Sequence, residues 1–301
     1  MSRQTIRLDV TEIAQIAEPA EVVAELVLPD NGAPDVVFVC LPGGGMNRRY
    51  FDLPTPDGDA QMSFAEAMGA RGHAVVLIDP LGSGESTVPK DCSLLHPDRM
   101  ADANTSIADH VIAGLKRGDL GPAAPDVRTV GAAHSLGALQ TIVQQARHAT
   151  YDAVCLMGFH VAGLPGQLTD ADRAMEPVQT RANLVETARG RFDMTYIDLP
   201  HPDGGRAVHT IPALDRVMMT PSLMAMLPDI VAPDAAKISV PVMLVQGDKD
   251  LHGDPRRMPA AYKACDEITL LVLPETRHNH FIYPTRTHLF ERVARWAECL
   301  S

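Results

Sequence analysis

The sequence of 301 residues is poor in aromatic side chains and has no long apolar run. Phenylalanine, tyrosine and tryptophan make up only 4% of it. No stretch approaches the roughly 20 apolar residues that cross a bilayer. The first fifteen residues also lack a basic segment followed by an apolar one, which a secretion signal would have. We therefore expect a cytoplasmic protein without a membrane span.

The sequence also has no clustered cysteines and no net positive charge. The cysteines form no CxxC pair and no cysteine–histidine cluster, which argues against a disulfide scaffold and a zinc site. They are Cys40, Cys92, Cys155, Cys265 and Cys299. The net charge of −12 disfavours nucleic acid or an anionic membrane surface as a partner. We expect a small-molecule substrate and no cofactor, with a homodimer as an open alternative.

What the sequence does contain is a regular exchange of short apolar runs and helical patterns. The runs are apolar throughout rather than at alternate positions, which indicates strands buried on both faces of a parallel sheet. Strands are predicted at 36–41, 74–79, 127–133, 152–158, 240–247 and 268–274, and helices at 61–71, 104–117, 136–148, 255–265 and 287–300. This order predicts a three-layer α/β fold with a mostly parallel central sheet.

Two intervals depart from that rhythm. Near the N-terminus, TIRLDV and EVVAELVLPD alternate in polarity with no helix between them, which predicts antiparallel strands at one edge. Residues 164–237 contain no strong strand, and a structureless loop of that length is improbable in a compact domain. We therefore predict a helical cap at 164–237, inserted into a core domain formed by 1–163 and 238–301.

Six of the fourteen methionines fall in the predicted cap. They are Met175, Met194, Met218, Met219, Met224 and Met226. They could fill the core between cap and sheet, or line an adaptable pocket for an apolar substrate. Both interpretations stay open at this point.

The stretch AAHSLGALQ places Ser135 where a predicted strand meets a predicted helix. Small residues at Ala133 and Gly137 leave room for the tight, strained turn that holds up a nucleophilic serine. The alternative is an ordinary serine that caps the helix. We predict that Ser135 is the nucleophile and that His134 packs behind the turn.

The stretch LPGGG follows the run at 36–41 and supplies three successive glycines. Glycines leave backbone N–H groups unobstructed, as an oxyanion hole requires. A simple turn explains one or two glycines well and three poorly. We predict that the N–H groups of Gly44 and Leu136 form the hole, with Gly45 as the neighbouring candidate.

A third glycine-rich stretch, DPLGSGES, follows the run at 74–79. It superficially resembles a phosphate-binding loop, but it lacks the Lys-Ser/Thr ending of a P-loop and opens no helix. We predict a turn, beginning at Asp79, that packs beneath the site.

The stretch QGDKDLHGDP offers three aspartates after the predicted strand at 240–247. A triad acid must lie on a loop just past a strand end, within reach of the histidine. The spacing from Gly247 favours Asp250. Asp248 is the runner-up, and Asp254 is a candidate for a helix cap.

The stretch LPETRHNHF follows the last predicted strand and carries two histidines. A general base needs a near-neutral pKa and a position on a loop from which it reaches the serine. The spacing after Pro274 favours His278, and His280 is the competitor. A metal site built from this pair and the nearby aspartates is weaker, because no third ligand shows metal-site spacing.

Taken together, these stretches resemble the α/β-hydrolase fold superfamily, as a serine-nucleophile member with an inserted cap. AHSLG matches the nucleophile elbow, LPGGG stands where the family often has His-Gly, and DPLGSGES matches the D-x-x-G-x-G-x-S turn. The order Ser135, Asp250, His278 is the order of the family's triad. The resemblance covers nearly the whole chain except the cap and identifies no subfamily.

The resemblance implies hydrolysis of a carboxylic ester of a small to medium apolar substrate. Gly45, Met46, His134 and His160 are candidates for lining the pocket, although His160 could also simply pack. A serine at the elbow argues against haloalkane dehalogenases and epoxide hydrolases, which use aspartate. Lactone, thioester, amide and carbon–carbon hydrolysis share the triad and stay open. So do acyl transfer to another acceptor and a non-catalytic ligand-binding role.

Overall fold

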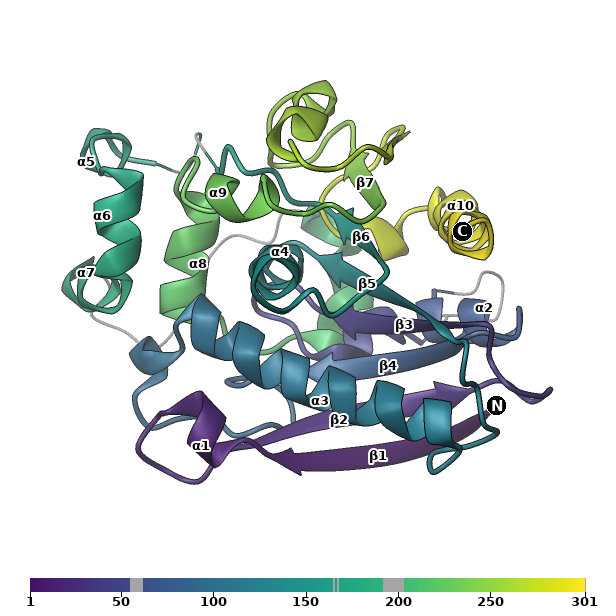
Figure 1. Cartoon of the computed structure of the whole chain (residues 1–301). Coiled ribbons are helices and arrows are strands. Elements are labelled where there is room, and N and C mark those ends of the chain that lie inside the picture. Colours follow the sequence, from purple (N-terminus) through teal and green to yellow (C-terminus); the bar gives the residue numbers. More distant parts are fainter. Residues whose placement is uncertain (55–61, 165, 167, 192–202, 301) are drawn as a thin grey trace.

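The computed structural model describes the chain except for residues 55–61, 165, 167, 192–202 and 301. Its centre is one sheet with the strand order β1-β2-β4-β3-β5-β6-β7-β8 (Figure 1). The strands are β1 (Ser2–Asp9), β2 (Glu21–Leu28), β3 (Val36–Leu41), β4 (Ala74–Asp79), β5 (Arg128–His134), β6 (Ala153–Met157), β7 (Val242–Gly247) and β8 (Ile268–Leu273). β1 pairs with β2, and β2 with β4, in antiparallel fashion. All neighbours in the remaining order β4-β3-β5-β6-β7-β8 pair in parallel. The predicted mostly parallel sheet with antiparallel N-terminal strands is therefore confirmed.

Helices cover both faces of the sheet, which makes the three layers (Figure 1). The longer ones in the core are α2 (Phe64–Gly69), α3 (Pro97–Arg117), α4 (Leu136–His148) and α10 (Arg286–Glu298). One apolar cluster joins α3 and α4 to one face, and a second joins α2 and α10 to the other. β3 and β4 are buried along their whole length between these clusters. This burial on both faces explains why their apolar runs do not alternate.

The parallel strands place their carboxyl ends along one edge of the sheet. β5 leads from there into the loop before α4, while β7 and β8 lead into the loops that carry Asp250 and His278. Residues distant in sequence therefore meet at this edge. That is where open α/β sheets bind ligands.

Three local predictions were wrong. A single-turn helix, α1 (Thr11–Ala14), stands between β1 and β2 where no helix was expected. α3 begins at Pro97 rather than at residue 104, because the His96 side chain accepts a hydrogen bond from Asp98 N and proline suits the first helical position. The helix expected at 255–265 is a 3₁₀ helix, η6 (Pro255–Ala261), with Pro259 inside it. Proline has no N–H for a regular helix there.

The segment between β6 and β7 is built from short helices and turns. They are α5 (Asp170–Arg173), α6 (Pro177–Ala182), α7 (Leu184–Arg191), η5 (Gly204–Ala213), α8 (Met219–Met226) and α9 (Ala232–Ala235). Met218 and Met224 join the same apolar cluster as α4, while Met175 and Met226 pack at its margin. Met219 is buried, and Met194 lies outside the described residues. Most of these methionines therefore fill the core. The separation of 164–237 as a cap stays a prediction.

None of the helices in the described ranges is both long and apolar enough to span a bilayer.

Candidate active site

Ser135 stands on a strained turn between β5 and α4. Its backbone has φ 51° and ψ −118°, a conformation that residues other than glycine rarely adopt. The turn is held because Ser135 N donates to Met157 O at 2.8 Å. A side chain at Gly137 would place its Cβ 2.2 Å from Leu41 O, so only glycine fits there. The Ser135 hydroxyl makes no capping bond to α4, which excludes the simple helix-cap alternative.

Ser135, His278 and Asp250 form a continuous relay of hydrogen bonds. The Ser135 hydroxyl lies 2.9 Å from His278 Nε2, and His278 Nδ1 lies 2.8 Å from Asp250 Oδ1. A carboxylate only accepts, so Nδ1 carries the proton and Nε2 is left to accept from the serine. This arrangement is able to take the proton from a serine that attacks a carbonyl.

The electrostatics of the pair favour that proton transfer. Burial by itself would lower the pKa of His278, but the charge and hydrogen bond of Asp250, helped by the charge of Asp203, raise it above its usual value. For Asp250 the directions are reversed. Burial by itself would raise its pKa, but the His278 and His280 imidazoles hold that pKa well below its usual range. Asp250 therefore stays ionised and stabilises a protonated His278.

Two further imidazoles surround the relay. His280 Nε2 lies 3.3 Å from Asp250 Oδ2, so His280 faces the acid and not the serine. His134 Nε2 lies 2.8 Å from the backbone oxygen of His278. This contact ties the loop after β8 that carries His278, which we call the base loop, to the turn at Ser135. Burial, reinforced by the charges of His278 and His280, holds the pKa of His134 well below its usual range. His134 is therefore a neutral donor to that oxygen.

Gly44 and Leu136 lie next to each other beside the serine. A Cβ built on Gly44 would lie 3.3 Å from Leu136 Cδ2, and one on Gly43 would lie 3.2 Å from Ser135 Cβ. Leu136 is the first residue of α4, and Gly44 is exposed. Neither backbone N–H has a backbone partner among the described residues. Both groups are thus available to an oxyanion at the serine, where the N-terminus of α4 also favours negative charge.

The turn after β4 is bonded to Arg48, which follows the glycine loop. The Asp79 carboxylate accepts hydrogen bonds from Arg48 N at 2.7 Å and from Glu85 N at 2.9 Å, and it pairs with the Arg48 guanidinium. A Cβ on Gly84 would lie 2.0 Å from Asp79 Cγ. Asp79 therefore serves as an anchor for two loops and not as a phosphate-binding group.

The remaining predicted residues have other local partners. Asp248 Oδ1 accepts a hydrogen bond from Thr276 N at 3.3 Å, and Asp254 caps η6. His160 is buried, and its Nδ1 accepts from Ala162 N at 2.9 Å. Gly45 and Met46 contact the segment before α8. The structure therefore does not place Asp248 in the relay.

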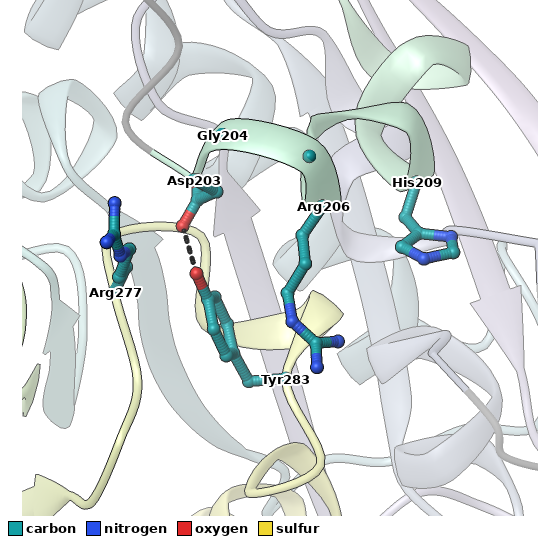
Figure 2. A pocket seen from close by; sticks show the side chains of 7 residues that line it. Asp203, Gly204, Arg206, His209, Arg277 and Tyr283 are labelled. Carbon is teal, nitrogen blue, oxygen red and sulfur yellow. Dashed lines mark hydrogen bonds between the residues drawn. The ribbon is translucent and has the colours of Figure 1, made fainter.

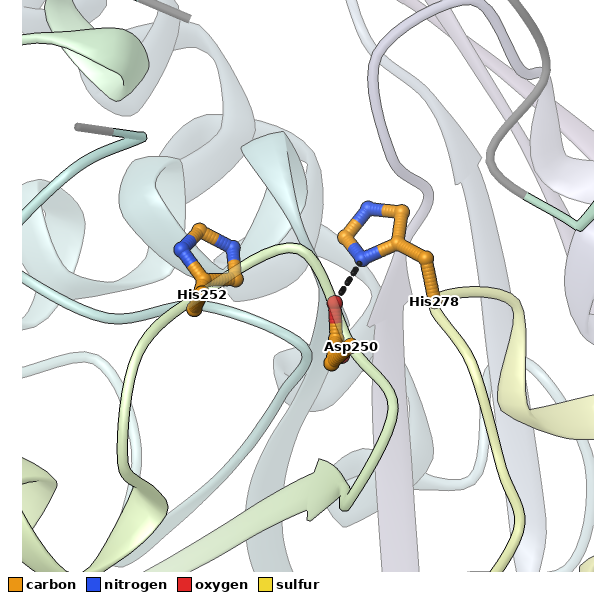
Figure 3. A group of neighbouring side chains, drawn as sticks. All are labelled: Asp250, His252 and His278. Carbon is orange, nitrogen blue, oxygen red and sulfur yellow. Dashed lines mark hydrogen bonds and ion pairs between the residues drawn. The ribbon is translucent and has the colours of Figure 1, made fainter. Parts of the chain in front are cut away.

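Asp250, His252 and His278 lie close enough to suggest a metal site (Figure 3). Their potential ligand atoms lie within 4.8 Å of one another. However, His278 Nδ1 is already bonded to Asp250. The two ring nitrogens of His252 lie 3.1 Å from the backbone oxygens of Gly163 and Gly158. Burial lowers the pKa of His252 to about 4, so its neutral ring donates to one of these two oxygens. Asp250 and His278 are engaged with each other, and this pairing fits a proton relay better than a metal centre.

Sequence reasoning missed Asp203, which anchors the base loop. Its carboxylate accepts hydrogen bonds from the Asn279 side chain and, at 3.0 Å, from the Tyr283 hydroxyl (Figure 2). It lines an open hollow of about 580 Å³ together with Arg206, Arg277 and their neighbours. Ser135, Asp250 and His278 are not among the lining residues. Nothing in the HPDGGR stretch signals this role, because the partners lie 76 and 80 residues away.

Comparison with known proteins agrees with this architecture. A model of the alpha/beta hydrolase family matches residues 37–289. The chain therefore belongs to the alpha/beta hydrolase family. No curated protein sequence matches it significantly.

Solved structures extend the likeness over the full chain. A thermostable carboxyl esterase from Bacillus coagulans superimposes with a TM-score of 0.70 and 15% identity, covering 100% of this chain and 99% of the esterase. A monoacylglycerol lipase from Paleococcus ferrophilus gives 0.63 and 16%, covering 100% of both chains. A thioesterase domain from the curacin biosynthetic pathway gives 0.60 and 15%, covering 99% and 100%. At these identities the likeness concerns the fold.

Proposed function

We propose that this alpha/beta hydrolase family member cleaves carboxylic esters of small to medium apolar substrates through an acyl-enzyme intermediate. The observation that carries the proposal is the relay of 2.9 and 2.8 Å hydrogen bonds from Ser135 through His278 to Asp250. The strained backbone at Ser135 supports it, because strain of this kind persists where the surrounding structure enforces it for function.

The reaction follows from the positions of these groups. His278 Nε2 removes the hydroxyl proton as Ser135 Oγ forms a bond to the ester carbonyl carbon. The N–H groups of Gly44 and Leu136 stabilise the negative oxygen of the tetrahedral intermediate. His278 then gives its proton to the departing alcohol oxygen, which breaks the ester bond and leaves an acyl-Ser135. Water then attacks the acyl carbon while His278 Nε2 takes one of its protons. His278 returns that proton to Ser135 Oγ as the acyl bond breaks and the acid leaves.

Ser135→Ala is the direct test. Removing the nucleophile of such a triad lowers kcat by about 10⁶-fold, so ester turnover should fall to the detection limit. A fluorophosphonate probe should label the wild type at Ser135 and leave the variant unlabelled. Ser106→Ala is a matched control, since among the described residues the Ser106 hydroxyl donates to Asp102 O within α3. Near-normal turnover in Ser135→Ala would refute the assignment.

The same triad serves other acyl acceptors and bond types. Product ratios measured with and without an added alcohol or thiol separate hydrolysis from acyl transfer. Parallel assays with esters, lactones and thioesters of equal chain length rank the bond types. Absence of probe labelling in the folded wild type would favour a ligand-binding role.

A further inference from the structure

A short segment before α8 is hydrogen bonded to the glycine loop beside Ser135. We call residues 213–217 the cap strap and residues 43–47 the oxyanion loop. Asp215 N donates to Gly45 O at 2.7 Å, and Asn47 N donates to Ala213 O at 2.9 Å. Met46 and Leu214 form the antiparallel bridge between these two bonds. The strap thus holds the oxyanion loop in the way one β-strand holds another.

The Asp215 side chain extends this connection to a third segment. Asp215 Oδ2 accepts a hydrogen bond from Gly84 N at 2.7 Å and lies 3.4 Å from Asn47 Nδ2. Gly84 belongs to the turn that is itself bound to Asp79. One half-buried carboxylate therefore joins the strap, the oxyanion loop and the turn after β4.

The strap also packs closely against the oxyanion loop. Gly45 has φ +74°, and a Cβ built on it would lie 3.0 Å from Val217 Cγ2. On the opposite side of the same loop, a Cβ on Gly43 would press against Ser135 and His134. The loop is therefore confined between the strap and the nucleophile elbow.

We propose that the cap strap sets the position of the Gly44 N–H, with Asp215 as a positioning residue for the oxyanion hole. The inference rests on the proposed function, in which Gly44 donates to the oxyanion. Such a donor acts only when it is fixed in advance at hydrogen-bond distance from the developing charge. A displacement of about 1 Å is enough to reduce turnover strongly. The segment between β6 and β7 thereby contributes to catalysis.

The test is Asp215→Ala, with Asp215→Asn as the conservative variant. The alanine variant loses the bond to Gly84 N, and we expect kcat to fall about 10- to 100-fold with KM within twofold. The inhibition constant of a trifluoromethyl ketone, which forms a tetrahedral adduct on the serine, should rise by the factor by which kcat/KM falls. The amide oxygen of Asp215→Asn still accepts from Gly84 N, so that variant should recover most of the activity. Asp126→Ala, at an exposed position before β5, is the control.

The outcomes separate the two proposals. If Ser135→Ala keeps its turnover, the proposed function fails whatever Asp215→Ala does. If turnover depends on Ser135 but Asp215→Ala keeps kcat within twofold of the wild type, the positioning role of Asp215 is refuted. If Asp215→Ala does not fold, Gly45→Ala replaces it, because its Cβ would press against Val217 and its backbone at φ +74° is strained in alanine. Its kcat should fall and be partly restored in Gly45→Ala/Val217→Ala, and an unchanged kcat in Gly45→Ala would refute the inference.

Discussion

Two buried aspartates stand at the carboxyl ends of strands and have different partners. Asp79 is the last residue of β4, and Asp250 follows the end of β7. Both side chains are 0% exposed. Asp79 pairs with the Arg48 guanidinium, whereas Asp250 faces the imidazoles of His278 and His280.

The partner decides what each carboxylate is able to do. An arginine does not release its proton in a protein, so the pair at Asp79 keeps its charges and acts as a fixed anchor for two loops. An imidazole titrates near neutral pH, so the pair at Asp250 responds each time a proton arrives at His278 or leaves it. Two equally buried aspartates are thus suited to different tasks, which are support of two loops for Asp79 and, in the proposed mechanism, proton transfer for Asp250.

Among substitutions at these two aspartate sites, Asp250→Asn should have the largest effect, a loss of kcat. The asparagine cannot hold His278 in the tautomer that accepts the serine proton, and kcat should fall by about 10⁴-fold. Steady-state ester hydrolysis measures it. Asp248→Asn, two residues away, is the control and should stay within threefold of the wild type. Equal losses in the two variants would remove Asp250 from the relay.

Arg48→Met should act on stability instead. It leaves the Asp79 carboxylate buried without its main cation, and losing one partner of a buried pair costs about 3 kcal/mol in the free energy of unfolding. Urea unfolding at pH 7 measures this loss. Arg49→Met, at the exposed neighbouring position, is the control. If both variants unfold at the same urea concentration, the anchor at Asp79 contributes little.

The loss in Arg48→Met should also depend on pH. Burial already raises the pKa of the Asp79 carboxyl above its usual value, and removing Arg48 raises it further. A carboxyl whose pKa is higher in the folded state destabilises the fold above its unfolded pKa. The loss should therefore be complete at pH 7 and become smaller as the pH falls toward about 4.

The smallest expected effect is a shift in the pH profile of kcat/KM, which reports directly on the pKa of His278. Only neutral His278 accepts the serine proton, so activity should fall as the pH drops through the raised pKa of His278. The midpoint should lie above the ordinary histidine value of about 6.5. Arg48→Met should keep the same midpoint, because it alters the other aspartate. A wild-type midpoint below that value would contradict the coupling between His278 and Asp250.

The sequence predicts those parts of the fold that depend on local patterns. The runs at Val36–Leu41 and Ala74–Asp79 became strands with the expected ends, and α4 spans the predicted 136–148. Continuous apolar runs of this kind have few alternatives in a buried sheet. The errors occurred where local signals were overlooked, such as His96 and Pro97 at the start of α3 and Pro259 within η6.

The candidate site shows where sequence reasoning ends. Motif spacing nominated Ser135, Asp250 and His278, and the structure brings these three together. Motif spacing could not show that His280 faces the second carboxylate oxygen of Asp250, or that Asp203 anchors the base loop. Nor could it show the bridge between Met46 and Leu214. These contacts join segments far apart in sequence, and no periodicity or composition records which loops meet in space.

The distance between Ser135 and His278 along the chain also bears on biosynthesis. They are separated by 143 positions, with Asp215 and Asp250 in between. A ribosome that adds about 5 to 20 residues per second needs about 7 to 29 s to pass from one to the other. The emerging chain therefore carries its serine long before it carries the imidazole that touches it. Any reaction in which Ser135 needs His278 as its base therefore cannot begin before His278 has been added and the two segments have met.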